Sequence, residues 1–247
     1  MMLRIKKKKP EQAGDADSQE EAVERRRNGA RGPLTEDDDT PVEVHPYTTP
    51  AVKRWLDVTI ASLALGILSP IWVLALALIK LDGPGPALLR QKRVGLNGRE
   101  FSFYKFRSMA PGVKNDISDR IPKGDLRTAL LSPRGRHPSV TKIGWVLRKT
   151  TVDELPQLLN VIKGDMSLVG PRPDMPEIVA HWPRHYLQRH KVKPGMTGLA
   201  QVNGRSDLTH HEKVRYDLQY VRHHPISRDL GILLKTIALV LSKKGAR

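Results

Sequence analysis

The longest apolar stretch in the chain runs from residue 58 to residue 81 and reads VTIASLALGILSPIWVLALALIKL. Its 24 residues are enough to cross a bilayer as one α-helix. Ser69 and Pro70 lie near its centre, and a proline inside a helix removes a backbone hydrogen bond and bends the axis. The pattern therefore predicts a helix that is broken in the middle.

Basic residues lie at both ends of this apolar stretch: Lys53 and Arg54 before it, then Lys80 in its last turn and Arg90, Lys92 and Arg93 after it. A helix that crosses a bilayer once carries its positive excess on one side. Charges at both ends favour a re-entrant helix, which enters the membrane, breaks at Ser69-Pro70 and leaves on the side it entered. A proline-kinked full span is the alternative, because neighbouring groups can satisfy the freed backbone.

Two short segments with strand character follow a turn-rich sequence at residues 82–86. They cover residues 88–94 and 100–108, and the Asn-Gly pair between them is a strong hairpin signal. Alternation along the second strand puts Lys105 and Arg107 on the same face. Two such cations are either an exposed strand pair or a contact for an anionic ligand.

The stretch from residue 148 to residue 173, RKTTVDELPQLLNVIKGDMSLVGPRP, combines cations, adjacent acids and a helical apolar run. Pro156 fits the first turn of a helix. Thr151 and Glu154 have the spacing of a capping box. We therefore predict a helix that begins at residues 151–153.

Asp153 and Glu154 would lie at the positive end of that helix, where the anionic form of a carboxylate is favoured. Arg148, just upstream, would bring a phosphate to the same place. Acids in a first helical turn are also ordinary capping residues. Spacing alone does not decide between these two interpretations.

The rest of the chain alternates loops and helices. The sequence predicts a Gly/Pro-rich polar loop at residues 110–139 and a glycine-rich loop at 192–205, with helices at 177–189, 209–221 and 228–244. The last helix has a 12-residue apolar core that Lys235 interrupts. It is suited either to the membrane interface or to packing in the core.

Charge is unevenly distributed along the 247 residues, whose formal net charge is +16. Residues 1–50 hold 9 Lys/Arg and 11 Asp/Glu in a composition typical of a disordered tail, and the remainder holds 33 and 15. A body this basic requires an anionic partner. Aromatic residues are only 5% of the chain and no zinc-finger spacing occurs, so we expect membrane lipid and phosphorylated substrates and no nucleic acid.

Four long strings resemble the bacterial sugar transferases, in that family's order: RQKRVGLNGREFSFYKFRSM from residue 90, VTKIGWVLRKT from 140, TTVDELPQLLNVIKGDMSLVGPRP from 150 and VKPGMTGLAQVNGR from 192. Members of that family are monotopic phosphoglycosyl transferases, which load a sugar 1-phosphate onto a polyprenyl phosphate. The resemblance covers roughly residues 51–247.

The resemblance implies an α+β, mostly helical, monotopic membrane protein with a small β-hairpin and interfacial amphipathic helices. Its domains would be a disordered tail at 1–50, a re-entrant helix at 51–82 and a catalytic region at 83–247. The implied activity transfers a sugar 1-phosphate from a UDP-sugar to polyprenyl (undecaprenyl) phosphate and initiates synthesis of a surface glycan such as an exopolysaccharide. The implied location is the bacterial inner membrane, with the catalytic face in the cytoplasm.

The resemblance also assigns site residues. Asp153 would be the nucleophile that forms an aspartyl-phosphosugar intermediate, and Glu154 would act as a base or help Asp153 to hold Mg²⁺. Ser69 and Pro70 would form the membrane break. The resemblance implies that six further residues bind substrate or phosphate: Lys105, Arg107, Arg148, Arg172, Arg205 and Asp217. A salt bridge is the alternative role of each.

One segment departs from the family pattern: the loop near residue 134 reads RGRHPSV, with His137 in place of an acid and Ser139 in place of an arginine. The resemblance leaves a homodimer open, and no heptad pattern supports one. A second class of function also stays open. The chain would then be a non-catalytic, basic membrane-anchored adaptor that binds anionic lipid or nucleic acid.

Overall fold

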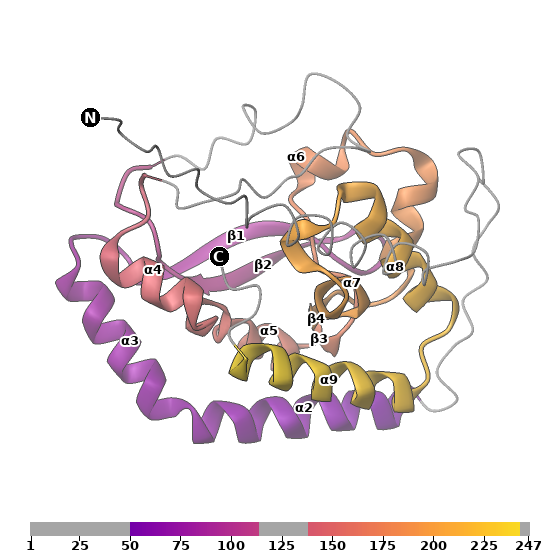
Figure 1. Ribbon diagram of the computed structural model, residues 1–247, viewed down its shortest axis with the longest axis horizontal. Helices are drawn as coiled ribbons and strands as arrows, with labels where there is room; N and C mark the ends of the chain where they lie inside the picture. The colour runs from indigo at the N-terminus through magenta and orange to yellow at the C-terminus, as the bar shows by residue number, and fades with distance from the viewer. Residues whose placement is uncertain (1–49, 114–137, 243–247) are drawn as a thin grey trace, which may run out of the picture. The chain divides into compact units, whose positions relative to one another are not determined.

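The computed structural model describes residues 50–113 and 138–242 of the chain. In these two ranges the protein is mostly helical and contains a small two-stranded antiparallel sheet (Figure 1). The prediction of an α+β, mostly helical fold is therefore confirmed. The predicted tail, most of the loop at 110–139, the departure at His137 and the last residues of the C-terminal helix lie outside the described residues.

The long apolar stretch forms two helices, α2 (Pro50–Ile67) and α3 (Ser69–Leu81), which are bent by 61° relative to each other. Ser69 Oγ donates a hydrogen bond of 2.8 Å to the carbonyl of Gly66, and Pro70 lies in the first turn of α3. The break is thus at the predicted residues. In the described ranges no single helix is long and apolar enough to cross a membrane, whereas the bent pair meets that test by length and composition.

Arg54 attaches α2 to α5 (Gln157–Lys163), the helix that follows the acid pair. Its two terminal nitrogens donate to the carbonyls of Val161 and Ile162, at 2.5 and 2.7 Å. Carbonyls in the last turn of a helix have no partner within that helix. Arg54 therefore caps α5 and fixes its distance from α2.

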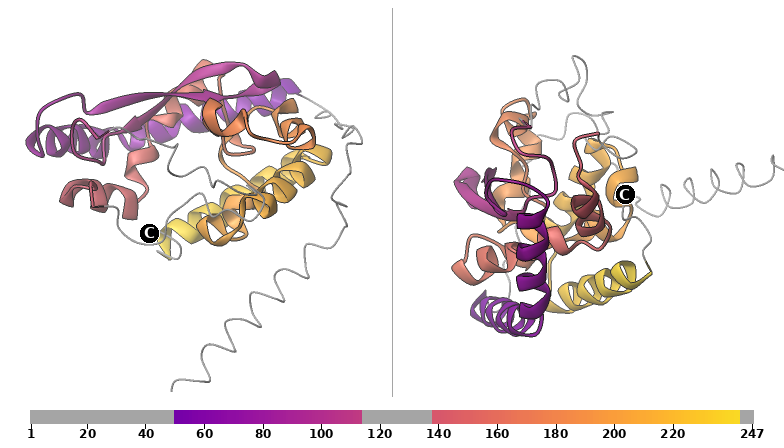
Figure 2. Two further views of the ribbon diagram at one scale, coloured as in Figure 1. Left: turned by 90° about the horizontal axis from the view of Figure 1, so that it is seen from above. Right: turned by 90° about the vertical axis from the view of Figure 1, so that its left-hand side faces the viewer.

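A buried ion-pair network ties α2 to two further parts of the body. Lys53 Nζ lies 2.7 Å from Asp229 Oδ2, at the start of α9 (Ile226–Leu241), and 3.3 Å from Asp57 Oδ1. The backbone N–H of Leu168 also donates to Asp57 Oδ1, at 3.1 Å. Figures 1 and 2 show α9 beginning beside the first turns of α2. The charges of α2 therefore lie on its inner face.

The predicted hairpin is confirmed. Strands β1 (Leu88–Val94) and β2 (Glu100–Phe106) pair antiparallel, with Leu88 opposite Phe106. A single turn of 3₁₀ helix, η1 (Leu96–Gly98), joins them, and both Asn97 and Gly98 have positive φ. Such angles suit Asn and Gly. The Asn160 side chain accepts from Tyr104 N–H and donates to the Ser102 carbonyl, and so docks α5 on the edge of β2.

The predicted helix start at residues 151–153 is wrong. Helix α4 (Lys142–Lys149) is followed by a 3₁₀ turn, η3 (Val152–Glu154), and α5 begins only at Gln157, after Pro156. Thr151 has φ 61°, in the left-handed region, and its side chain makes no capping hydrogen bond. A capping box needs an extended residue at that position. The chain instead uses this turn to redirect itself between α4 and α5.

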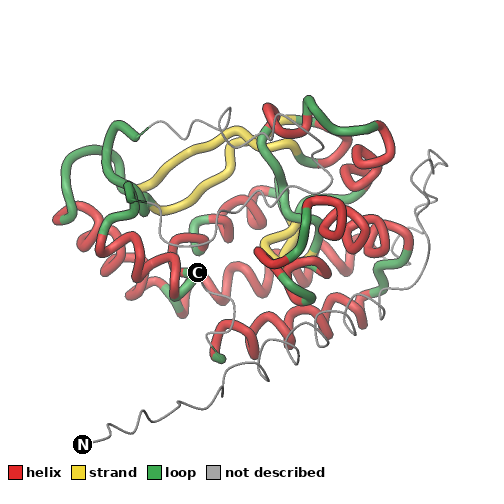
Figure 3. Tube along the Cα trace, turned by 45° about the horizontal axis from the view of Figure 1, so that its top comes forward, coloured by secondary structure: helices red, strands yellow, loops and turns green. Residues whose placement is uncertain are grey.

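A second small sheet lies apart from the hairpin (Figure 3). Strands β3 (Ser167–Val169) and β4 (Gly195–Thr197) pair parallel, and β4 lies within the segment 192–205 that was predicted to be a glycine-rich loop. A Cβ at Gly195 would lie 2.1 Å from the backbone nitrogen of Gly170. Glycine at this position therefore permits the close approach of the two backbones. Strands of three residues are too short to show the alternation of apolar and polar residues that predicts a strand.

The C-terminal third consists of short helices and two longer ones. The helix predicted at 177–189 is in fact two, α6 (Pro176–Val179) and η4 (Arg184–Lys191). Pro183 separates them, because proline disfavours helical backbone in the residue before it. Short turns α7 (Leu199–Val202) and η5 (Arg205–Asp207) come next, then α8 (His210–Arg222) and α9. The prediction for α8 is confirmed, with Thr209 and Glu212 forming its capping box.

Candidate active site

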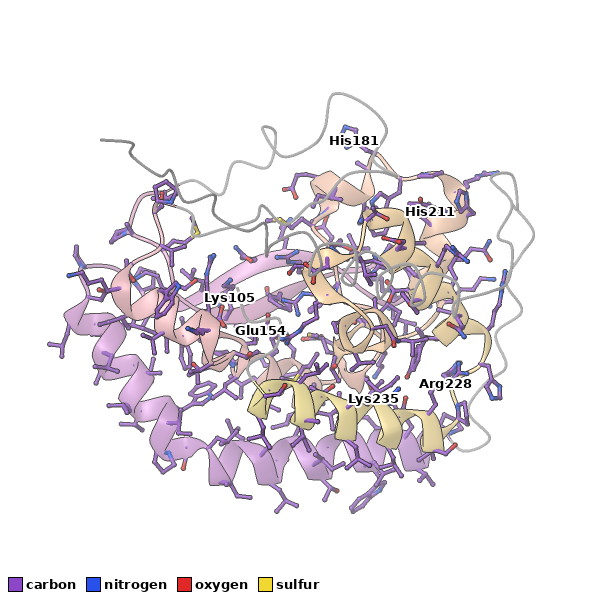
Figure 4. The ribbon with its side chains drawn as sticks, in the orientation of Figure 1. Lys105, Glu154, His181, His211, Arg228 and Lys235 are labelled. Atoms are coloured by element: carbon purple, nitrogen blue, oxygen red, sulfur yellow. The ribbon has the colours of Figure 1, made fainter. Side chains whose placement is uncertain are left out.

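The acid pair lies in η3, where it faces strand β2. Asp153 is 6% exposed, and its Oδ2 is 3.8 Å from the ammonium group of Lys105. Figure 4 shows Lys105 and Glu154 beside each other near the middle of the molecule's described part. The left-handed backbone of Thr151 comes two residues before Asp153. Strained backbone of this kind is common where a side chain must be held in place for chemistry.

Burial dominates the electrostatics of Asp153 and Lys105. Burial, followed by the charge of Glu154, raises the pKa of Asp153 above its usual range, while Lys105, Arg148 and Arg172 oppose the shift. Burial also lowers the pKa of Lys105, against the charge of Asp153. The cations therefore favour the anionic form of Asp153, but they only partly offset a buried environment that disfavours a lone charge.

Glu154 and Arg172 form a two-pronged ion pair. The Arg172 nitrogens donate to Oε2 at 3.1 Å and to Oε1 at 2.5 Å. Burial alone would raise the pKa of Glu154, but the charge and hydrogen bonds of Arg172 lower it below its usual range. Glu154 in turn raises the pKa of Arg172. The glutamate is therefore an anion with little tendency to take up a proton.

Arg148 is oriented toward the acid pair by Ser108. The Nε of Arg148, in the last turn of α4, donates to Ser108 Oγ at 2.8 Å. Gly144 allows α4 to come this close, because a Cβ there would meet the Ser108 carbonyl at 2.0 Å. Arg148 then contributes to lowering the pKa of Asp153. Ser108 was not among the predicted site residues, although the KFRSM string contains it.

Arg107 lies in a different environment from Lys105, despite their predicted common face. Its side chain is buried and donates to three backbone carbonyls at the end of α3 and in the loop after it, those of Ile79, Gly83 and Pro84. Strand β2 ends at Phe106, so strict alternation does not extend to Arg107. These bonds favour a structural role for Arg107 over a direct phosphate contact.

Asp217 is a buried partner of Arg189. Its Oδ2 lies 2.5 Å from Arg189 Nη2, and burial raises the pKa of Asp217 to about 7 in spite of this neighbour. The contact favours the salt-bridge alternative over a direct phosphate contact. Arg189 itself was not predicted to be a site residue, because it lies in the basic run RHYLQRHK, which looks like a solvated surface.

Arg205 opens η5 with a positive φ of 52°, and its charge lowers the pKa of Glu154. The structure thus gathers four of the predicted cations around the pair Asp153 and Glu154, namely Lys105, Arg148, Arg172 and Arg205. Two carboxylates among four cations form a site for a highly charged anion. Reactions of such anions include phosphoryl transfer.

The acid pair also fits Mg²⁺. Within the described residues no three His, Cys, Asp or Glu side chains come together as a metal site. Mg²⁺ does not need such a cage, since it usually binds one or two carboxylates, waters and substrate phosphates. Because Arg172 occupies both oxygens of Glu154, Asp153 is the better-placed ligand of the two.

Lys105→Met is expected to move the acid limb of the pH profile of kcat/KM to higher pH. The lysine lowers the pKa of Asp153, so its removal raises that pKa, and the Asp153 carboxyl stays protonated up to a higher pH. We expect a loss of about 10²-fold at neutral pH. Lys105→Arg, which keeps the charge, is the control. An acid limb that stays in place in Lys105→Met would disprove the assignment.

Comparison with known proteins gives the class to which this site belongs. Residues 48–243 match the model of the bacterial sugar transferases. The chain is 40% identical over 207 residues to the galactosyl transferase CpsE of Streptococcus agalactiae, an alignment that covers 83% of this chain and 46% of the relative. It is 41% identical over 198 residues to the UDP-glucose:undecaprenyl-phosphate glucose-1-phosphate transferase of Xanthomonas campestris, covering 74% and 38%.

A third relative is closer to this chain in length. It is the exopolysaccharide production protein ExoY of Rhizobium meliloti, which is 38% identical over 197 residues, with 78% of this chain and 87% of the relative covered. The chain spans less than half the length of the two larger relatives. The protein belongs to the bacterial sugar transferase family.

Proposed function

We propose that the protein transfers a sugar 1-phosphate from a UDP-sugar to polyprenyl (undecaprenyl) phosphate and releases UMP. The observation that carries the proposal is a buried aspartate, Asp153, held 3.8 Å from Lys105 within a ring of cations. Relatives in this family are named as enzymes that act on UDP-glucose and undecaprenyl phosphate. The product would start a surface glycan, such as an exopolysaccharide.

In the first half-reaction, the Asp153 carboxylate attacks the β-phosphorus of the UDP-sugar. A bond forms between the carboxylate oxygen and phosphorus, the bond from phosphorus to the bridging oxygen breaks, and UMP leaves. Aspartate has this role in other phosphoryl-transfer enzymes. Lys105 and Arg148 face the nucleophile and offset the charge that accumulates on the phosphoryl oxygens.

In the second half-reaction, an oxygen of the polyprenyl phosphate attacks the same phosphorus. The new bond completes a polyprenyl diphosphate-sugar, and the bond to Asp153 breaks, which regenerates the carboxylate. Two roles were expected for Glu154, a base and a residue that helps Asp153 to hold Mg²⁺, and the ion pair with Arg172 disfavours the first. Its lowered pKa makes Glu154 a weak base.

A bound Mg²⁺ would supply charge neutralisation to the diphosphate. Asp153, with Glu154 beside it, would hold the ion together with the substrate's own oxygens. The remaining phosphate oxygens would be bound by Arg148 and Arg205. We expect activity to require a divalent cation.

The membrane arrangement is part of the proposal and is supported by exposed apolar side chains. On α2 and α3 they include Trp55, Leu63, Ile67, Val73 and Leu81, each at least 60% exposed. On α9 the exposed apolar side chains follow helical spacing, at Leu230, Leu234, Ile237 and Leu241. Apolar faces of this extent are typical of a lipid contact. The catalytic face would lie on the cytoplasmic side of the inner membrane.

Pro70→Ala is expected to straighten α2 and α3 toward one continuous span, because alanine restores the missing hydrogen bond and removes the clash of the ring. The chain has no cysteine, so Glu100→Cys in the exposed hairpin gives one reporter of topology. In the native background that cysteine should be labelled from the cytoplasmic side only. Part of the Pro70→Ala population should become accessible from the other side.

The control for this experiment is Pro86→Ala, which changes an exposed proline outside both helices. It should leave the labelling pattern unchanged. Cytoplasmic labelling alone in Pro70→Ala would show that the proline is not the cause of re-entry. Labelling of the native hairpin from the periplasmic side would instead support the kinked full span.

The direct test of the proposed function is UMP release from a panel of UDP-sugars in the presence of polyprenyl phosphate and magnesium. The proposal predicts turnover that depends on the lipid phosphate, and the active sugar would name the substrate. No release from any nucleotide sugar, in a folded and membrane-inserted sample, would contradict it. The non-catalytic adaptor would then become the better account.

A further inference from the structure

Arg189, in η4, is a buried cation that the proposed reaction does not use. It is 3% exposed, and its guanidinium carbon lies 5.0 Å from the centre of the Trp182 ring. One terminal nitrogen donates to Asp174 Oδ2 at 2.7 Å, and the other lies 2.5 Å from Asp217 Oδ2. A buried arginine shared by two carboxylates is rare enough to need an explanation.

The same guanidinium also holds the backbone of Arg172, the residue that binds Glu154. Its Nη2 donates to the Arg172 carbonyl at 2.7 Å. The residues on either side of Arg172 are fixed as well, because the Pro171 carbonyl accepts from Gly195 N–H at 2.9 Å and the Asp174 carbonyl accepts from Val94 N–H at 3.0 Å. The segment 171–174 is therefore held from three directions, with the Arg172 side chain directed to the acid pair.

We infer that Arg189, anchored on Asp217, is a positioning residue that holds the segment 171–174 so that Arg172 meets Glu154. The inference rests on the proposed function and deepens it. It gives a role to Asp217, which the family resemblance had placed among the residues implied in substrate or phosphate binding. Only a planar guanidinium offers enough fixed donors to bind Asp174, Asp217 and a backbone carbonyl together.

The principal test compares Arg189→Lys with Arg184→Lys. Lysine keeps the charge but cannot reproduce the three contacts, whereas Arg184 is exposed on the same η4 turn and serves as the matched control. We expect Arg189→Lys to lower kcat/KM about 10²-fold, the loss that small misplacements cause. Arg184→Lys should behave like the native chain.

A double-mutant cycle separates positioning from general damage. If Arg189 acts through Arg172, then Arg189→Lys should add little to the loss in an Arg172→Ala background. Asp217→Asn, which keeps the side-chain volume, provides a second variant and should show the same lack of additivity even if Arg189→Lys folds poorly. Losses that multiply for both variants would overturn the inference.

A titration of Glu154 gives a readout that does not depend on activity. Glu154 is faced by Asp153 on η3, Lys105 on β2, Arg93 on β1, Arg172, and Arg205 on η5. Misplacing Arg172 leaves the others in place and removes the strongest stabiliser of the anion, so the pKa of Glu154 should rise in Arg189→Lys.

The measurement is ¹³C NMR of labelled glutamate carboxyls, with Glu154→Gln to assign the signal. An upward shift in Arg189→Lys supports the inference even if no UDP-sugar proves active. An unchanged titration overturns it. An inactive native chain, by contrast, would count against the proposed function alone.

Discussion

Asp153→Asn is expected to lower turnover by about 10⁴-fold or more, because the amide cannot form the acyl phosphate intermediate. The substitution keeps the volume and shape of a side chain that is 6% exposed. It also removes a buried charge whose raised pKa shows that its surroundings disfavour ionisation. We therefore expect the variant to be at least as stable as the native chain, although it is inactive. The measurement is steady-state UMP release with polyprenyl phosphate present.

The control for Asp153→Asn is Glu100→Gln, which makes the same carboxylate-to-amide change at an exposed position on β2. It should leave turnover within about twofold of native, as surface substitutions generally do. Substantial turnover by Asp153→Asn would show that a different group attacks phosphorus. A loss of activity accompanied by unfolding would leave the fold, not the chemistry, as the cause.

Lys53→Met is expected to destabilise the protein by about 3–5 kcal/mol, the cost of leaving buried carboxylates without their cation. The lysine side chain is 12% exposed, and the Asp57 and Asp229 carboxylates that it joins are each 6% exposed. Tyr220 also donates to Asp229, at 2.8 Å. With Lys53 removed, α2 and α9 would each bring a buried carboxylate into the contact between them without the charge of this lysine.

The thermal unfolding midpoint of the detergent-solubilised protein is the measurement for Lys53→Met. Lys92→Met is the matched control, because Lys92 pairs with Glu100 across the hairpin and its side chain is 79% exposed. Such a surface pair contributes about 0–1 kcal/mol. Equal shifts in the two variants would mean that the network between α2 and α9 has no special part in stability.

The elements that the sequence predicted well are those with local causes. Pro70 breaks the helix wherever the surrounding chain is placed, and Asn97-Gly98 closes a hairpin through its own backbone angles. The capping box of α8 also depends on neighbours in sequence, Thr209 and Glu212. The same spacing at Thr151 and Glu154 failed, because Glu154 is bound to Arg172, eighteen residues later in the chain.

The parts that the sequence could not predict depend on partners far apart in the chain. Arg107 reads as a strand cation, yet its partners are carbonyls at the end of α3. Arg189 reads as part of a solvated basic run, yet it is buried between Asp174 and Asp217. Neither pairing has a sequence signal. The residues around Asp153 were predictable chiefly because long strings resembled a known family.

Whether Asp153 carries the sugar phosphate is tested most directly by mixing the native protein with the active UDP-sugar in the absence of polyprenyl phosphate. The account predicts a burst of UMP stoichiometric with enzyme, and an intact protein that gains the mass of one phosphosugar at Asp153. Adding the lipid phosphate should then remove that mass. UMP release only when both substrates are present, with no modified protein, would contradict the covalent mechanism and indicate direct transfer in a single step.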